Sequence, residues 1–124
     1  MPAKTYLLYH VIVTTKYRRP LLDNPNVLAR VSYAADHQAA RRGGHVLAFN
    51  YGPDLAHIHI LLTLPPSAQL AAWLRDFKSE SARLSNAWLG RAGHPFWGRR
   101  YFAKTIGAGS LDAARRYVAE QWPK

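Results

Sequence analysis

Two histidines lie two positions apart in a segment with the two-residue period of a β-strand. In AHIHILLTLPP (56–66), Ile58 and Ile60 point one way, whereas His57 and His59 point the other. Alternate residues of a strand project from one face about 7 Å apart, so two imidazoles placed this way can bind one divalent cation. An isolated His-x-His pair is more often two sheet residues that are hydrogen-bonded to their neighbours. Here the apolar surroundings favour a metal site, because a buried strand carries paired polar rings only at a cost in free energy.

The C-terminal segment offers a third ligand and a nucleophile. Tyr117 and Gln121 are four residues apart and therefore share one face of a helix. A carboxamide oxygen suits Mg²⁺ or Mn²⁺. A phenol ionises at about pH 10, so it attacks phosphorus well only when a metal or a general base stabilises the phenolate. From the spacing alone, a tyrosine packed on a sheet beside an exposed glutamine is the simpler interpretation. His10 lies on the first expected strand, from which it could face the same site.

The charge of the chain indicates a polyanionic partner. Seventeen Lys and Arg against seven Asp and Glu give a formal net charge of +10. A small, folded and strongly basic domain most often binds nucleic acid, although a solvated basic surface is the plainer alternative. Trp97 and Tyr101 are equally suited to the core or to base stacking. The residues that we expect to contact DNA are the basic side chains and one tyrosine of two turns and the last helix: Lys16, Tyr17, Arg18, Arg19, Arg99, Arg100, Arg115 and Arg116.

These residues must be positioned by seven elements. Periodicity and turn residues predict strands at 6–15, 45–51, 56–64 and 101–107, and helices at 26–42, 67–89 and 111–122. Ser67 is expected to cap the second helix, and 90–100 is expected to be a loop. The order predicts an α+β, ferredoxin-like or RRM-like fold: a four-stranded antiparallel sheet with helices on one face, plus a C-terminal helix that carries Tyr117. We expect residues 1–124 to form one domain.

Composition excludes several classes of function. The chain has no cysteine, which excludes disulfides, zinc knuckles and thiol catalysis and fits a reducing compartment. No apolar run approaches the roughly 20 residues that span a bilayer, and the N-terminus lacks the layout of a signal peptide. Nucleotide-binding, hydrolase and zinc-protease signatures are missing as well. We therefore expect a soluble, cytoplasmic protein with no membrane partner and no small-molecule cofactor beyond the metal.

Three sequence blocks together resemble a known family, the single-tyrosine HUH transposases of the insertion-sequence 200/605 group, or transposase IS200-like domain. The blocks are YHVIVTTKYRRPLL (9–22), HIHILLTLPP (57–66) and the region from FWGRRYFAKTIG to ARRYVAEQ (96–121). The resemblance implies that His57 and His59 bind Mg²⁺ or Mn²⁺ with Gln121 as the third protein ligand. It also implies that Tyr117 is the nucleophile. Family members act as homodimers on single-stranded DNA marked by hairpins, where they form a 5′-phosphotyrosine and a free 3′-OH before they rejoin strands.

One departure from the family pattern lies just before the histidine pair. The family usually has Asp immediately before the first histidine, whereas this chain has Ala56 there and Asp54 three positions before His57. Either the turn is longer by two residues, or an acidic contact to the metal ligands is missing. Two other functions stay open at this point. One is a host-domesticated relative that cuts repeated palindromes, and the other is an RRM-like nucleic-acid-binding module without catalysis.

Overall fold

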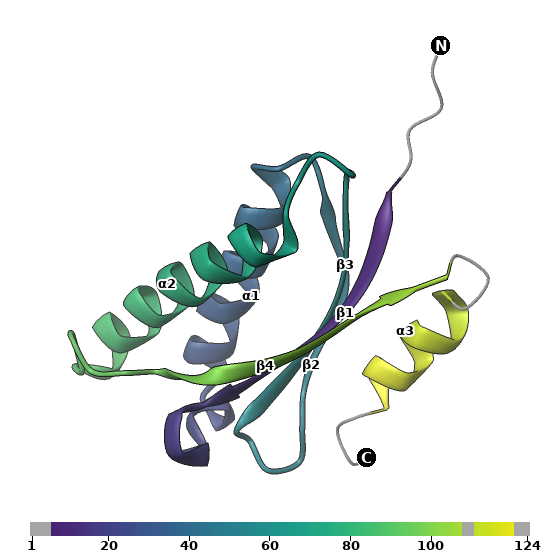
Figure 1. Ribbon diagram of the computed structural model, residues 1–124. Coiled ribbons are helices and arrows are strands. Elements are labelled where there is room, and N and C mark those ends of the chain that lie inside the picture. Colours follow the sequence, from purple (N-terminus) through teal and green to yellow (C-terminus); the bar gives the residue numbers. More distant parts are fainter. Residues whose placement is uncertain (1–5, 108–110, 121–124) are drawn as a thin grey trace.

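The computed structural model describes residues 6–107 and 111–120, which form a four-stranded antiparallel sheet between two layers of helix (Figure 1). Helices α1 and α2 cover one face of the sheet, and the short α3 lies on the other. The strands lie in the order β2-β3-β1-β4, so β3 and β1 are central. The predicted α+β arrangement is therefore confirmed. The elements are β1 (Leu7–Thr15), α1 (Pro25–Ala40), β2 (His45–Tyr51), β3 (His57–Leu64), α2 (Leu70–Leu89), β4 (Trp97–Ile106) and α3 (Leu111–Ala119), with 3-10 turns η1 (Lys16–Arg18) and η2 (Leu21–Asp23) after β1.

The main core lies between the sheet and helices α1 and α2. Ile58 and Ile60 of β3 are fully buried there, as the period of two predicts. From α2, Trp73 and Phe77 stack with ring centroids 5.0 Å apart, and the Trp73 indole donates a hydrogen bond to the carbonyl of Ala35 in α1. This layer holds the sheet rigid beneath the opposite face.

A second, smaller cluster lies on the face that carries α3, which we call the α3-side face. Leu61 of β3 and Leu8 of β1 are buried there against Val118 of α3. The register of the antiparallel strands places Ile12 opposite His59 on this face, and His10 opposite Leu61. The histidines therefore lie beside a small apolar patch on which α3 rests.

Two of the predicted boundaries were wrong. β4 begins at Trp97 rather than at 101, because Trp97 pairs with Thr15 across an irregularity in the register and donates from its indole to Ser81 Oγ. The charged, glycine-containing sequence hides that start. Ser67 does not cap α2; the helix begins at Leu70 after Gln69, whose side chain makes no capping hydrogen bond. None of the described helices is long and apolar enough to cross a membrane.

Candidate active site

β3 presents both histidines of the pair on the α3-side face. Their ring centroids are 5.0 Å apart, and the ring planes are inclined by 66°. His59 is only 2% exposed, and its Nε2 atom is buried without a hydrogen-bond partner among the described residues. A buried polar atom is normally satisfied, so a buried imidazole nitrogen with no hydrogen-bond partner on this face fits the role of a metal ligand.

His10 of β1 holds the other nitrogen of His59. The His10 Nε2 and His59 Nδ1 atoms are 3.0 Å apart, and the two rings stack with centroids 5.2 Å apart. Burial, and then the proximity of His57 and His10, lowers the pKa of His59 to about 4. Burial, and then the charge of Lys104, lowers the pKa of His10. Both rings are therefore neutral at pH 7, and the neutral imidazole is the form that binds metals.

Asp54 supplies the acidic contact that the sequence left open. Its Oδ1 atom lies 2.7 Å from His57 Nδ1 and also accepts a hydrogen bond from the Ala56 N–H. Burial alone would raise the pKa of Asp54, but the Ala56 N–H and then His57 and Arg18 hold the pKa below its ordinary value. Of the two alternatives, the acidic contact is therefore present and the turn is longer by two residues. This longer turn folds back so that the Asp54 carboxylate reaches the His57 ring. Asp54 and His10 engage Nδ1 of His57 and His59, respectively, which leaves both Nε2 atoms as the candidate ligand atoms.

The close approach of this turn requires unusual backbone. Leu55 has φ = 59°, in the left-handed region that non-glycine residues seldom adopt. Gly52 lies directly under the His57 ring, and a Cβ atom at this position would be 2.0 Å from Cε1 of that ring. A side chain at Gly52 would therefore displace the candidate ligand. Neither requirement is visible from the pattern of the sequence.

Tyr117 of α3 lies over the histidines. Its ring centroid is 5.6 Å from that of His10 and 5.8 Å from that of His59, and it meets both rings edge-on. Asn50 of β2 fixes the end of the helix, because its Nδ2 atom donates to the carbonyls of Val118 and Ala119 at 3.1 and 3.2 Å. The structure therefore brings together the tyrosine and the histidine pair, which are far apart in the sequence. Gln121 lies outside the described residues.

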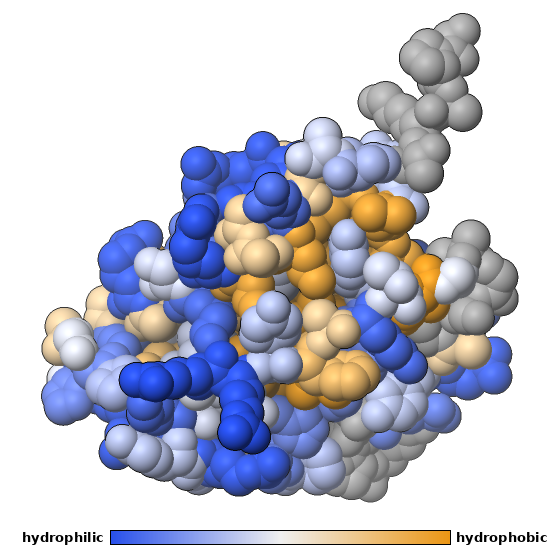
Figure 2. Space-filling model, viewed as in Figure 1, coloured by the Kyte–Doolittle hydropathy of each residue, from blue (hydrophilic) through white to orange (hydrophobic). Residues whose placement is uncertain are grey.

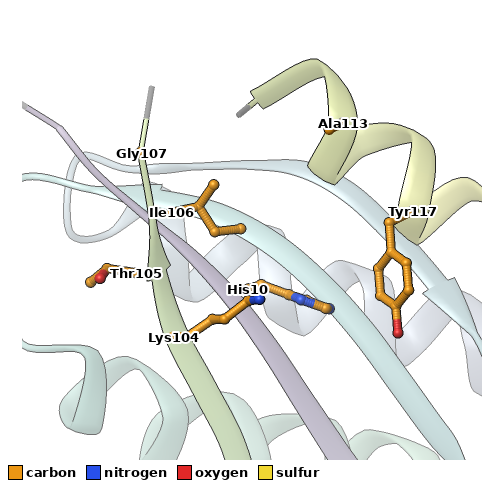
Figure 3. A pocket seen from close by; sticks show the side chains of 7 residues that line it. All are labelled: His10, Lys104, Thr105, Ile106, Gly107, Ala113 and Tyr117. Carbon is orange, nitrogen blue, oxygen red and sulfur yellow. The ribbon is translucent and has the colours of Figure 1, made fainter. Parts of the chain in front are cut away.

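A cavity of about 350 Å³ opens between the end of β4 and α3. Figure 3 shows His10 between Lys104 of β4 and Tyr117 of α3, with Ile106 and Ala113 further along the two walls. Three functional groups therefore surround this cavity: the imidazole of His10, the amine of Lys104 and the phenol of Tyr117. His10 also contacts the candidate metal ligand His59. A phosphate or part of a nucleotide that entered this cavity would lie beside the Lys104 cation and the Tyr117 phenol.

The turn that follows β1 exposes an aromatic ring between cations. Tyr17 is 75% exposed, and the charged groups of Lys16 and Arg19 lie 5.4 and 5.6 Å from its ring centroid. Tyr17 and Arg18 both have positive φ, a strained arrangement of the kind that collects at functional sites. Arg18 also donates to Asp54 at 3.1 Å, so this turn contacts the carboxylate that supports His57.

The other predicted DNA contacts are divided between the two faces of the sheet. Arg99 lines a hollow with Arg75 and Lys78 of α2, on the helix side and away from the histidines. Tyr101, which is half exposed, lines the same hollow, whereas Trp97 belongs to the main core. Arg100 is exposed on β4, and Arg115 and Arg116 are exposed on α3. Sequence reasoning missed Asn50 and Lys104, because nothing in their local pattern marks them.

The site fits a metal with two imidazole ligands. Within residues 6–107 and 111–120, no group of three or more His, Cys, Asp or Glu side chains could hold an ion. His57 and His59 would need a ligand of another type, and the predicted one is the Gln121 carboxamide. Neutral nitrogen donors together with an amide oxygen suit a divalent cation that keeps open positions for a phosphate.

The fold and the site define a small α+β protein that carries a tyrosine on a helix over paired histidines of a central strand. The sequence matches the family described as "Transposase IS200 like" over residues 3–121, so the chain belongs to that family. A search of curated proteins finds no match.

Two solved structures share the fold. A protein of Deinococcus radiodurans R1, described as a candidate transposase, has a TM-score of 0.71 and 21% identity, with 100% of this chain and 97% of that chain covered. A REP-associated tyrosine transposase bound to a REP hairpin has a TM-score of 0.67 and 16% identity, with 95% of this chain and 68% of that chain covered. At these identities the comparison establishes the fold.

Proposed function

We propose that this chain is a DNA transposase that cuts and rejoins single-stranded DNA through a covalent bond to Tyr117. The observation that carries the proposal is the position of the Tyr117 ring over the hydrogen-bonded pair of His10 and His59. Membership of the transposase family supports the class of reaction. The basic net charge and the exposed cations around the site support a nucleic-acid substrate.

In the proposed step, the phenol oxygen of Tyr117 attacks the phosphorus of a phosphodiester. The new bond joins this oxygen to the 5′-phosphate, the bond to the 3′-oxygen breaks, and that oxygen takes up a proton while the phenol loses one. Mg²⁺ or Mn²⁺ held by His57, His59 and Gln121 would neutralise charge on the phosphate. Because a phosphotyrosine is itself a phosphodiester, the energy of the broken bond is kept and a 3′-OH can reverse the step.

The chain's own residues keep the site ready for this step. His10 and Asp54 fix the two rings by their Nδ1 atoms, and burial keeps His59 neutral. The Asn50 side chain holds α3, so that the phenol stays near the pair. Positioning of this kind converts an encounter between nucleophile and phosphate into a step within one complex.

Hairpin DNA is the substrate that we propose, because a structural relative is a tyrosine transposase bound to a REP hairpin. The proposed contacts are the exposed turn with Lys16, Tyr17, Arg18 and Arg19 and the cations Arg100, Arg115 and Arg116.

We also propose a homodimer. Mixing Tyr117→Phe chains with chains that lack both His57 and His59 would restore cleavage if the tyrosine of one chain serves its partner. If each chain uses its own tyrosine, the mixture would stay inactive.

A covalent-adduct assay tests the proposed function. Labelled single-stranded hairpin DNA is incubated with the protein and Mn²⁺, and denaturing gels then detect DNA attached to protein. Tyr117→Phe should remove the adduct and retain binding, whereas Tyr101→Phe, at an equally exposed ring on the helix side, should retain both. Adduct formation by Tyr117→Phe, or DNA mapped by mass spectrometry to another tyrosine, would contradict the mechanism. A binding module without catalysis would yield no adduct at all.

A further inference from the structure

The edge strand β4 directs an aromatic ring and an amine toward the histidine site. The register places Phe102 opposite Ile12 of β1, and Ile12 in turn opposite His59 of β3. In the neighbouring row, Lys104 lies opposite His10. Opposite residues of antiparallel strands point to the same face, so Phe102 and Lys104 both lie on the α3-side face. Two rows of side chains thus lead from the free edge of the sheet to the candidate active site.

Phe102 is left uncovered on this face. The ring is 50% exposed and belongs to neither hydrophobic cluster of the described residues. Within the part of the chain that the structure describes, helix α3 packs mainly on β2 and β3 and covers less of the β1 and β4 half of the face. Figure 2, which has the view of Figure 1 with the β4 edge toward the reader, shows apolar surface in the middle of the view between strongly hydrophilic areas. An exposed aromatic ring on an edge strand is an aggregation risk unless it has a ligand.

Lys104 has no acidic partner among the described residues. No Asp or Glu of these residues forms an ion pair with it, although the chain pairs Arg18, Arg42 and Arg75 internally. Instead, the strand register places it opposite His10 of β1. It also lines the cavity beside Tyr117. A cation such as Lys104 at the wall of the cavity that Tyr117 also lines is suited to bind an anionic group of a ligand.

We propose that Phe102 and Lys104 form a nucleotide subsite for single-stranded DNA next to the phosphate that Tyr117 attacks. This inference rests on the proposed function of the Tyr117 site. The base stacks on Phe102, and a phosphate of the same strand lies against Lys104 in the cavity. The two side chains are about 7 Å apart along β4, and Phe102 is about 10 Å from His59 across two strand spacings. A nucleotide adjacent to the cut spans such separations.

Single-stranded DNA is the occupant that the chemistry favours. A face with an exposed aromatic ring and a cation that has no acidic partner among the described residues complements a ligand that has both a π-face and a negative charge. Paired bases present only their edges in the grooves, so a duplex could not stack on Phe102. A protein partner with an acidic, apolar surface would also neutralise Lys104, but it would not need the cavity between Lys104 and Tyr117.

Adjacent aromatic residues of β4 provide a matched test. Phe102 and Tyr101 are both 50% exposed, and they lie on opposite faces of the sheet. Phe102→Ala should weaken the binding of unstructured single-stranded DNA by about 5- to 150-fold, the range expected for loss of one stacked base. Tyr101→Ala should leave it unchanged. Phe102→Trp should bind like the unmodified protein, whereas Phe102→Leu, which keeps apolar bulk without a π-face, should bind as weakly as Phe102→Ala.

Photocrosslinking supplies a readout that does not depend on a variant folding. Iododeoxyuridine-substituted single-stranded DNA should crosslink to Phe102 of the unmodified protein, as mapped by mass spectrometry. A plot of log affinity against log salt concentration has a negative slope, and Lys104→Gln should make this slope less steep by about one, as expected for one lost phosphate contact. Crosslinks confined to other residues, or equal binding by the Phe102→Ala and Tyr101→Ala proteins, would overturn the subsite.

The covalent-adduct assay tests the proposed function, and the Phe102 experiments test the subsite, so failure of one can be told from failure of the other. If the unmodified protein forms no covalent adduct with DNA, the Tyr117 mechanism is wrong whatever the crosslinks show. If the adduct forms and Phe102→Ala changes neither affinity nor the DNA concentration needed for half-maximal adduct formation, only the subsite is wrong. Under the subsite proposal, Phe102→Ala raises that concentration, and saturating DNA restores most of the adduct rate.

Discussion

Replacing Asn50 with Ala should release helix α3, which carries the proposed nucleophile Tyr117. The Asn50 Nδ2 atom donates to two backbone carbonyls at the end of α3. Each hydrogen bond contributes about 0.5–1.5 kcal/mol, so losing both should destabilise the docked position by about 1–3 kcal/mol. The docked population then falls about 5- to 150-fold relative to the released one. Helix α3 has only nine residues, too few to be stable without the sheet, so docking and helix formation should be lost together.

Two measurements check this prediction. Amide hydrogen exchange in α3 should speed up in Asn50→Ala while exchange in β1 and β3 stays unchanged. In a single-turnover assay the rate of adduct formation should fall by up to the same factor, which is reached when the released state predominates, because only the docked tyrosine is near the histidine pair. Asn50→Asp is a sharper variant, since it keeps the acceptor that receives the Tyr51 N–H but loses the donor to α3.

The control is Asn24→Ala, which removes the side-chain cap of α1 on the other side of the sheet. Its loss should cost about 1 kcal/mol of global stability. This variant should unfold earlier in urea but form the adduct at the unmodified rate under native conditions. If Asn50→Ala exchanges and reacts like Asn24→Ala, the Asn50 side chain does not hold Tyr117 in place, and the reasoning from its two hydrogen bonds is refuted.

Three further predictions concern the site. His57→Ala and His59→Ala should each abolish the adduct and retain most of the affinity for DNA in gel-shift assays, because the cations supply that affinity; cleavage by the double variant would exclude the metal site. Charge reversal of Arg18 and Arg19 should weaken binding and its salt dependence, and an affinity that is constant from low to moderate salt would argue against a nucleic-acid ligand. The pKa of His59 lies at about 4 in the folded chain and at 6.5 ordinarily, so the unfolded chain binds the extra proton. The metal-free protein should therefore lose up to about 3 kcal/mol of stability as the pH falls from 6.5 to 4, and urea unfolding of His59→Gln should lack this loss.

The sequence predicts the geometry of the histidine pair because that geometry is local. A period of two places His57 and His59 on one face of a strand whatever the rest of the chain does. The same holds for the buried set that begins with Ile58 and Ile60, and for the order of elements that leads to the α+β sheet. These predictions need only the repeat of apolar residues and the turns between elements.

The parts of the site that the sequence does not reveal depend on contacts between distant segments. Tyr117 meets His59 only because α3 crosses the face of the sheet opposite α1 and α2, which spacing within α3 cannot indicate. Asp54 reaches His57 only through a turn with Leu55 in a left-handed conformation. Asn50 looks like any polar residue near the end of a strand. Its role depends on the carbonyls of a helix that begins about sixty residues later.

The distribution of stability in the fold matches the demands of the proposed reaction. The candidate metal ligands lie on β3, which has a hydrogen-bonded strand on each side and the main core beneath it. Ligand positions there can be held within narrow limits, as an ion requires. The proposed nucleophile lies instead on a nine-residue helix, whose contacts with the sheet in the described part of the chain include the buried Val118, the Asn50 side chain and the Tyr117 ring against His10 and His59. A step that attaches DNA to Tyr117 and later hands it to another 3′-OH needs that part of the site to leave and return. A short helix that depends on the sheet for its stability suits this requirement, and strengthening its attachment should slow rejoining more than cleavage.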